Sequence, residues 1–203
     1  GKIISVDKSS HYIQYIENNL QNKYPQIIPI CTSFEDLNLE PNSIDHMFCR
    51  WSLAWVQNPN KIIDNIKNFL KKGGKAVFHE YYDWSTHQIF PFKENIDKCI
   101  KTALKSFKES DFEIDIGAAL PQLLYDMDFS IISTRLMPKL AKPNSKEWNW
   151  PKTFYYNYFP RLVKMGYLNN NDTKEFFQDF KSLEILPYSR IFCPILIEII
   201  AEK

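Results

Sequence analysis

Asp7 is the first residue whose type and position could do chemistry. It ends the β-rich run Lys2–Val6 and stands just before Ser9 and Ser10, either of which could cap a helix. A carboxylate at the carboxyl end of a parallel strand can accept hydrogen bonds from both hydroxyls of a ribose. Nicotinamide, flavin and S-adenosylmethionine sites share this feature. The alternative is a carboxylate that only caps the following helix, and both interpretations fit the position equally well.

A second set of reactive side chains, His79, Glu80 and Tyr81, ends a strand predicted over residues 75–81. Ligands of open α/β sheets bind outside the carboxyl ends of the strands. His79 or Glu80 could there deprotonate a hydroxyl or a carboxylic acid, and these three residues are the weak candidates for a catalytic role. A metal site built from His79 and His87 is not predicted, because no ligand-rich spacing such as HExxH is present.

The elements that position these residues alternate between strand and helix through the first eighty residues. Apolar runs predict strands over residues 2–7, 27–31, 44–49 and 75–81. One helix follows Ser9 or Ser10, and a second begins at Pro59 and ends at Gly73-Gly74, where a glycine can take the left-handed conformation. Short connections between alternating strands and helices predict a parallel sheet with helices on both faces.

The rest of the chain has a less regular pattern. An amphipathic helix is predicted around residues 96–107, and a short helix over 120–127 leads into a strand over 129–137. A helix over 151–165 is expected to kink or break at Pro160. Asp172-Thr-Lys-Glu175 resembles a capping box for a further helix. A final strand is predicted over 191–201.

Composition excludes several classes of protein. The formal net charge is +1, without the clustered surplus of Lys and Arg that binding to nucleic acid requires. No apolar run approaches the ~20 residues that span a bilayer. The four cysteines are scattered without a CxxC spacing, which is typical of a reduced, cytoplasmic protein.

Aromatic residues make up 15% of the chain and concentrate in the segment from Trp148 to Phe159. Helical spacing cannot place so many consecutive aromatic side chains on one face. The segment is therefore either a lid or interface that buries an apolar or cationic substrate, or a helix packed into the core.

Several stretches in a fixed order strongly resemble the class I S-adenosylmethionine-dependent methyltransferases. The likeness is strongest to the small-molecule group related to ubiquinone, biotin-precursor and trans-aconitate methyltransferases, and it covers residues 1 to about 82. The stretches are Asp7, Ser33–Leu37, Ser43–Pro59, Leu70–Lys75 and the strand end His79-Glu80-Tyr81.

The resemblance implies an α/β fold with a Rossmann-like sheet, mostly parallel with an antiparallel last strand, and a helical, aromatic-rich cap. The cap segments would be about 83–118 and 139–186 of a single domain over residues 1–203. The family's sheet order is 3-2-1-4-5-7-6, and this sequence begins at the second strand. The first strand, its glycine-rich loop and the first helix are therefore expected ahead of Gly1. The alternatives are a strand from elsewhere that fills the place, or a degraded relative that binds no cofactor.

The resemblance also implies the cofactor, S-adenosyl-L-methionine, with S-adenosyl-L-homocysteine as the product. Asp7 would hold the ribose, and Cys49, Arg50 and Trp51 would line the methionine part. Around the adenine the implied residues are Lys8, Ser33 and Phe34. The family often has an acid where Ser33 stands, so its hydroxyl or the nearby Glu35 would accept the bond from the adenine amino group.

The sequence thus predicts a cytoplasmic methyltransferase, a monomer or homodimer, that methylates a small apolar or aromatic acceptor without binding nucleic acid or membrane. In-line methyl transfer needs alignment and exclusion of water more than a particular acid or base. The main alternative is a methyltransferase-like binding or scaffold protein that has lost the cofactor. A nicotinamide-dependent enzyme is a weaker alternative, because the last two predicted strands suit the methyltransferase sheet.

Overall fold

The computed structural model describes all 203 residues, and the chain divides into two compact units. The smaller unit contains residues 1–47, 58–75 and 203, and the larger contains residues 48–57 and 76–202. No helix is long and apolar enough to cross a membrane.

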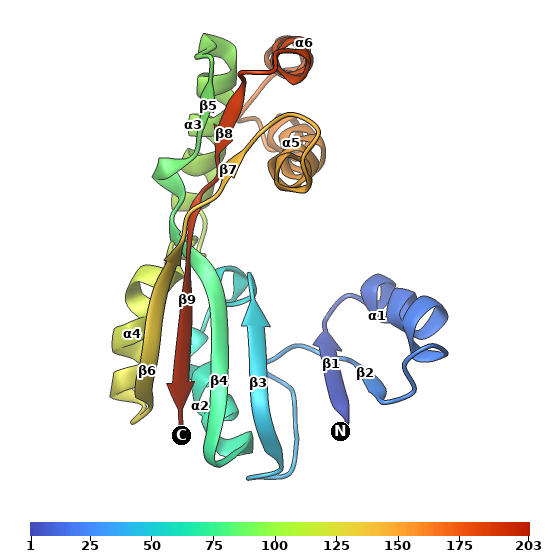
Figure 1. Cartoon of the computed structure of the whole chain (residues 1–203), viewed down its shortest axis with the longest axis vertical. Helices are drawn as coiled ribbons and strands as arrows, with labels where there is room; N and C mark the ends of the chain where they lie inside the picture. The colour runs from blue at the N-terminus through green and yellow to red at the C-terminus, as the bar shows by residue number, and fades with distance from the viewer. The chain divides into compact units, whose positions relative to one another are not determined.

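The smaller unit contains a two-stranded parallel sheet (Figure 1). Strand β1 (Ile3–Asp7) pairs with β2 (Ile27–Cys31), and between them run helix α1 (Ser10–Ile16) and the π-helical turn η1 (Glu17–Gln21). The strands confirm the predicted positions.

Helix α2 (Pro59–Phe69) also belongs to the smaller unit. It starts where Pro59 predicts, because the Asn58 side chain accepts a hydrogen bond from the Lys61 amide. It ends earlier than predicted, since Leu70 is already extended and strand β4 (Leu70–Asp83) follows directly. Gly73 does adopt the left-handed conformation, with φ of 77°, but as part of β4 rather than as a helix cap.

A four-stranded sheet has the order β3-β4-β9-β6. Its strands, besides β4, are β3 (Ile44–Arg50), β6 (Ser130–Met137) and β9 (Ile195–Glu202). Strands β6 and β9 pair antiparallel, from Ser130 with Glu202 to Met137 with Leu196. In the family's strand numbering, β3-β4-β9-β6 corresponds to strands 4-5-7-6 of the expected sheet, and the pair β1-β2 corresponds to strands 2 and 3. The predicted fold class is therefore confirmed. A first strand stays a prediction.

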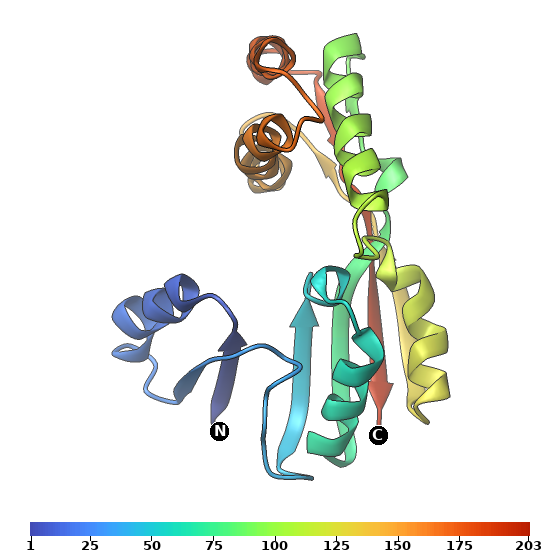
Figure 2. The same ribbon diagram turned by 180° about the vertical axis from the view of Figure 1, so that it is seen from behind.

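Helix α4 (Ile116–Asp126) packs on β6 and β9 (Figures 1 and 2). It starts four residues before the predicted helix. Gly117 in its first turn permits a close approach to β4: a Cβ there would lie 2.6 Å from the Tyr81 carbonyl oxygen and 2.7 Å from Ile197 Cγ2.

The remaining elements of the larger unit build a second hydrophobic core. Helices α3 (Glu94–Lys108), α5 (Lys146–Lys164) and α6 (Asn170–Ile185) pack on one another (Figure 2). Beside them, a three-stranded antiparallel sheet has the order β5-β8-β7. Its strands are β5 (Gln88–Phe90), β7 (Leu140–Ala141) and β8 (Arg190–Phe192).

The aromatic segment supplies much of this second core. Trp148, Tyr155 and Phe159 of α5 are fully buried and pack with Phe176 and Phe180 of α6. The core interpretation therefore holds for this face of α5. Other aromatic side chains of α5 do point elsewhere, as the spacing requires: Tyr156 is 42% exposed and stacks on Phe177.

Three local predictions are wrong in this region. Helix α5 begins at Lys146, where Ser145 caps the Trp148 amide, and it continues through Pro160 without a break. The capping box of α6 joins Asn169 and Asp172, not Asp172 and Glu175. The strand expected over 191–201 is two strands in different sheets, because Cys193 and Pro194 separate β8 from β9.

A buried polar pair lies inside this core. His87 Nδ1 donates to the Phe192 carbonyl oxygen, so in the neutral ring Nε2 accepts the hydrogen bond from the Tyr155 hydroxyl. Burial lowers the pKa of His87 from 6.5 to about 4, because the imidazolium would be desolvated. The pair thus satisfies two polar groups in an apolar core without introducing a charge.

The close contact at Gly117 predicts the effect of G117A. Helix propensity alone would make alanine more stable than glycine by ~1 kcal/mol, but the added methyl meets backbone that cannot move freely. We expect G117A to lower the free energy of unfolding by ~1–3 kcal/mol in urea denaturation. A118G, on the exposed side of the same turn, should cost ~1 kcal/mol through propensity alone. A more stable G117A would contradict the close packing of α4 on β4.

The neutral state of His87 predicts a loss of stability in acid. The unfolded state takes up a proton near pH 6.5 and the folded state only near pH 4, so stability falls as the pH drops through this window. Between pH 7 and pH 4.5 this residue should account for ~2 kcal/mol. H87N keeps a donor for the Phe192 carbonyl and does not titrate, so the loss over this range should be smaller by that amount in urea denaturation. Equal losses in the two proteins would show that His87 is not held neutral.

Candidate functional site

The chain turns sharply at the carboxyl end of β3. Trp51 has a φ of 53°, in the left-handed region that non-glycine residues rarely adopt, and its amide donates to the His79 carbonyl oxygen at 3.0 Å. A short 3-10 helix, η2 (Leu53–Trp55), follows at once. Backbone strain of this kind persists only where surrounding contacts hold it, and it concentrates at functional sites.

Glu80 supplies those contacts. Its side chain is fully buried, and Oε1 accepts hydrogen bonds from the amides of Ser52 at 2.9 Å and Leu53 at 3.1 Å. The Cys49 thiol donates to the same oxygen at 3.6 Å. Desolvation raises the pKa of Glu80, while the two amides and the thiol act in the opposite direction. The residue predicted as a weak candidate for a general base is thus committed to holding the turn.

The turn aims Trp51 into a group of three nearly parallel rings, the aromatic triad of Trp51, Tyr81 and Trp150. The ring centroids of Trp51 and Trp150 lie 5.1 Å apart at 13°, and those of Trp51 and Tyr81 lie 5.9 Å apart at 7°. Burial raises the pKa of Tyr81, and a hydrogen bond from Trp150 opposes that shift. Sequence reasoning missed Trp150, although it noted the aromatic segment that contains it.

Arg50 lies next to the triad. Its guanidinium carbon is 4.0 Å from the centroid of the Trp51 ring, the distance of a cation–π contact. Cys49, by contrast, is buried in the core against Glu80, and burial raises the pKa of its thiol. The resemblance assigns three residues to the methionine part of the cofactor. Two of them, Arg50 and Trp51, contact each other, whereas Cys49 points into the core and contacts Glu80.

His79 is engaged by other partners. Strand alternation places it on the face opposite to Glu80, where Nε2 lies 2.8 Å from Oε2 of Glu198. Arg135 donates to the other oxygen of Glu198 at 2.9 Å. The hydrogen bonds from His79 and Arg135 lower the pKa of Glu198. His79 and His87 thus have separate partners, and the chain has no cluster of three or more potential metal ligands.

In the smaller unit, Asp7 ends β1 as predicted. Its Oδ1 accepts a hydrogen bond from the Ser9 amide at 2.7 Å, while Oδ2 has no protein partner. Oδ1 therefore binds the amide that precedes α1, and Oδ2 can accept a hydrogen bond from a ligand. Lys8 follows with an exposed side chain, and its carbonyl oxygen accepts from the Cys31 thiol.

Ser33 and Phe34 lie after β2 in the same unit. The Ser33 hydroxyl donates to Oδ2 of Asp36 at 2.7 Å and accepts from the Asp36 amide at 3.1 Å. The Phe34 carbonyl oxygen accepts from Asn65 at 3.2 Å. The acid that forms hydrogen bonds with Ser33 is Asp36, and the expected contact of Ser33 or Glu35 with the adenine stays a prediction. The Ser-x-x-Asp spacing of a serine-capped turn was the signal that could have found it.

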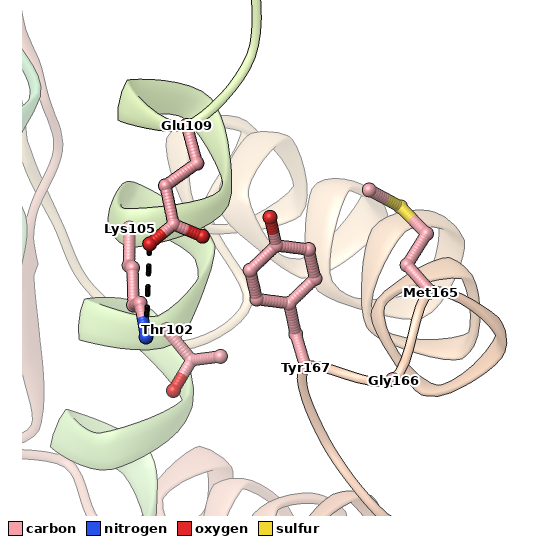
Figure 3. A pocket seen from close by; sticks show the side chains of 6 residues that line it. All are labelled: Thr102, Lys105, Glu109, Met165, Gly166 and Tyr167. Carbon is pink, nitrogen blue, oxygen red and sulfur yellow. Dashed lines mark ion pairs between the residues drawn. The ribbon is translucent and has the colours of Figure 1, made fainter.

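A pocket of about 330 Å³ lies elsewhere in the larger unit, between α3 and the turn after α5 (Figure 3). In the close view the Tyr167 ring points toward Glu109, which pairs with Lys105 at 3.7 Å. None of the residues predicted to bind cofactor or to act in catalysis lines it. The lining residues are Thr102, Lys105, Glu109, Met165, Gly166 and Tyr167.

Comparison with known proteins agrees with the fold. Residues 1–78 match the model of a methyltransferase domain family. The chain also aligns over its full length with a candidate methyltransferase of Bacillus halodurans C-125, with a TM-score of 0.64, 12% identity and 83% of that chain covered. The protein has a class I methyltransferase fold. No curated protein matches the chain.

Two further solved methyltransferases have ligands bound. The phosphoethanolamine N-methyltransferase 2 of Haemonchus contortus contains phosphomonomethylethanolamine and S-adenosylhomocysteine; the TM-score is 0.55 at 15% identity, over 100% of this chain and 44% of that one. A geranyl diphosphate methyltransferase is in complex with S-adenosylmethionine, with a TM-score of 0.52 and 11% identity over 99% of this chain and 68% of that one. The match over residues 1–78 and the alignment of the whole chain therefore agree on the fold of a class I methyltransferase.

The Glu80 contacts predict distinct effects of two substitutions. E80A leaves the half-buried amide of Ser52 and the buried amide of Leu53 unpaired and should lower the free energy of unfolding by ~3 kcal/mol. E80Q keeps an oxygen acceptor and should cost less. Because the pKa of Glu80 is raised in the folded protein, the wild type loses stability as the pH rises above 4.5, whereas E80Q does not titrate.

Urea denaturation at pH 4.5 and pH 7.5 measures both effects. The stability of E80Q relative to the wild type should increase with pH, and E40Q, at an exposed glutamate, should show no such trend. If E80Q is as destabilised as E80A at both pH values, Glu80 does not hold the turn through its oxygen.

Proposed function

We propose that the protein transfers a methyl group from S-adenosyl-L-methionine to a small acceptor with an apolar or aromatic body. The observation that carries the proposal is the aromatic triad beside the strained turn at the carboxyl ends of β3 and β4, where ligands of open α/β sheets bind. Rings at this place can bury an apolar molecule and exclude water from it.

The neighbours with bound ligands give this proposal support of another kind. One contains phosphomonomethylethanolamine, and the other is named for geranyl diphosphate, so both are connected with small molecules. The net charge of +1 also favours a small acceptor over a nucleic acid. A cytoplasmic monomer or homodimer remains our proposal for its state in the cell.

The cofactor, when bound, supplies an electrophilic methyl group on a sulfonium. In the smaller unit, Asp7 fits this ligand because one carboxylate oxygen is without a protein partner and can accept hydrogen bonds from the ribose hydroxyls. Lys8, Ser33 and Phe34 are proposed to lie beside the adenine. In the larger unit, Arg50 and Trp51 are proposed to lie at the methionine end of the cofactor, where the methyl group is transferred. Cys49 is proposed to contribute indirectly, because its thiol donates a hydrogen bond to Glu80.

In this proposal the residues of the chain orient the two reactants and exclude water from them, and proton transfer has a smaller role. Glu80 fixes the turn, and Tyr81, which is buried and stacked with Trp51 and Trp150, contributes a rigid wall. The displacement at a methyl group gains most from such alignment, because it needs a near-attack geometry and a dry site.

Titration calorimetry with S-adenosylhomocysteine on the intact chain tests the proposed function. We expect saturable binding, and we expect D7A to weaken it by ~1–3 kcal/mol because two hydrogen bonds to the ribose are lost. D64A, at an exposed aspartate of α2, should bind like the wild type.

The absence of binding by the folded wild-type chain would contradict the proposal and favour a protein that no longer takes the cofactor. An unchanged affinity in D7A would remove Asp7 from the site.

A further inference from the structure

The three-stranded sheet β5-β8-β7 of the larger unit has one buried face and one outward face (Figure 1). Residues directly opposite each other in an antiparallel pair point to the same side, so the register sets the two faces. Ile89, Ile191 and Ala141 are buried in the second core. The alternate residues point the other way. They are Gln88 and Phe90 of β5, Arg190 and Phe192 of β8 and Leu140 of β7.

The outward face is apolar and open to solvent. Leu140 is 62% exposed and Phe90 is 51% exposed, although both lie within hydrogen-bonded strands. Phe90 pairs with Arg190, and two further rings lie two residues from this pair along the chain. These are Phe92, which is 66% exposed, and Tyr188, which is 63% exposed. We call Phe90, Phe92, Leu140, Tyr188 and Phe192 the apolar sheet face.

The size of this face can be compared with that of known interfaces. A large aromatic side chain can bury about 150–250 Å², so the exposed parts of the four most exposed members offer roughly 450 Å². Apolar patches of about 300–600 Å² on a monomer are often functional. Two such faces in contact would bury about 900 Å² from these side chains alone, close to the ~1,000 Å² of a specific interface.

The face has little charge with which to select a partner of a different kind. The only ionisable residue in its outward row is Arg190, whose guanidinium donates to the carbonyl oxygens of Pro187 and Ser189. Interface centres are enriched in aromatic residues and arginine and depleted of lysine and acids. A second copy of the chain supplies an apolar surface of matching area and brings no acid to this row.

The edges of the sheet are poorly suited to bind a partner. Strand β5 has three residues and β7 has two, whereas strands in globular proteins usually have about five or six. Edges this short offer few free backbone groups for an added strand. A partner is therefore expected on the face of the sheet and not along its edge.

We propose that the apolar sheet face packs against the same face of a second copy and forms a two-fold symmetric dimer. In such a dimer one patch serves both subunits, and the two sheets stack about 10 Å apart with their side chains interdigitated. The inference is independent of the proposed methyl transfer, because no residue of this face is assigned to the cofactor or to catalysis.

Sedimentation velocity on the intact chain over a range of concentrations tests the proposal. The wild type should have twice the mass of the chain at high concentration and dissociate on dilution. L140D places one carboxylate on each copy of the face, so the dissociation constant should rise at least tenfold. Y125D introduces the same charge at a tyrosine of α4 that is 76% exposed, and it should leave the dimer unchanged.

Hydrogen exchange of the wild type locates the contact without a variant. Peptides that cover residues 88–92 and 186–192 should exchange more slowly in concentrated than in dilute protein. A peptide over residues 120–126 should exchange equally in both. This comparison decides the case even if L140D does not fold.

Four results would overturn the proposal. They are a monomeric wild type at submillimolar concentration, a dimer whose affinity L140D leaves unchanged, a dimer that protects other segments only, and an open-ended assembly in place of a dimer. A monomer that binds phosphatidylcholine vesicles, and loses this binding in L140D, would assign the face to a lipid surface instead.

Discussion

The buried carboxylate of Glu80 is the interaction on which the site at the carboxyl ends of β3 and β4 depends. One oxygen receives the amides of Ser52 and Leu53 and the thiol of Cys49. Placing a carboxylate in an apolar interior is unfavourable unless such donors compensate it. The donors compensate only in part, because Oε2 is buried without a partner and desolvation still raises the pKa of Glu80. The contacts of Oε1 hold the turn after β3, in which Trp51 has a left-handed conformation.

This constraint explains why the reactive-looking residues of β4 differ in their roles. Alternation along the strand sends Glu80 to one face, where it holds the turn, and sends His79 and Tyr81 to the other. His79 is paired with Glu198, while Tyr81 joins the aromatic triad. Positioning thus takes precedence over proton transfer, in keeping with the needs of methyl transfer.

The second core lets the larger unit present Trp150 to the triad. On one face of α5, Trp148 and Tyr155 pack on α6. On another face, Trp150 contacts Trp51 and Phe154 contacts Trp84. The aromatic segment is therefore core on one face. That its other face borders the methyl acceptor stays a proposal.

Much of the fold could be predicted because local signals agree with one another. Alternating strands and helices, Pro59 at a helix start and the apolar face of α2 all predict the same α/β architecture. The structure has it, with β1 and β2 paired parallel. The split of residues 191–201 was missed because β8 and β9 are both apolar, and only Pro194 marks the boundary. The capping box was misplaced by three residues because Asn169 and Asp172 are both good caps.

The site was harder to predict for a physical reason. Asp7 and Trp51 could be singled out by their positions after strands, but the function of Glu80 depends on amides 27 and 28 residues away in the sequence. The stacking of Trp150 on Trp51 spans about a hundred residues. No periodicity or short motif records contacts at such separations.

Hydrogen exchange of the Ser52 and Leu53 amides tests the central claim most directly. If Glu80 holds the turn, both amides in the wild type should exchange as slowly as those of the central strand β9. In E80A they should exchange at least tenfold faster while β9 stays protected. Fast exchange of these two amides in the wild type would contradict the account.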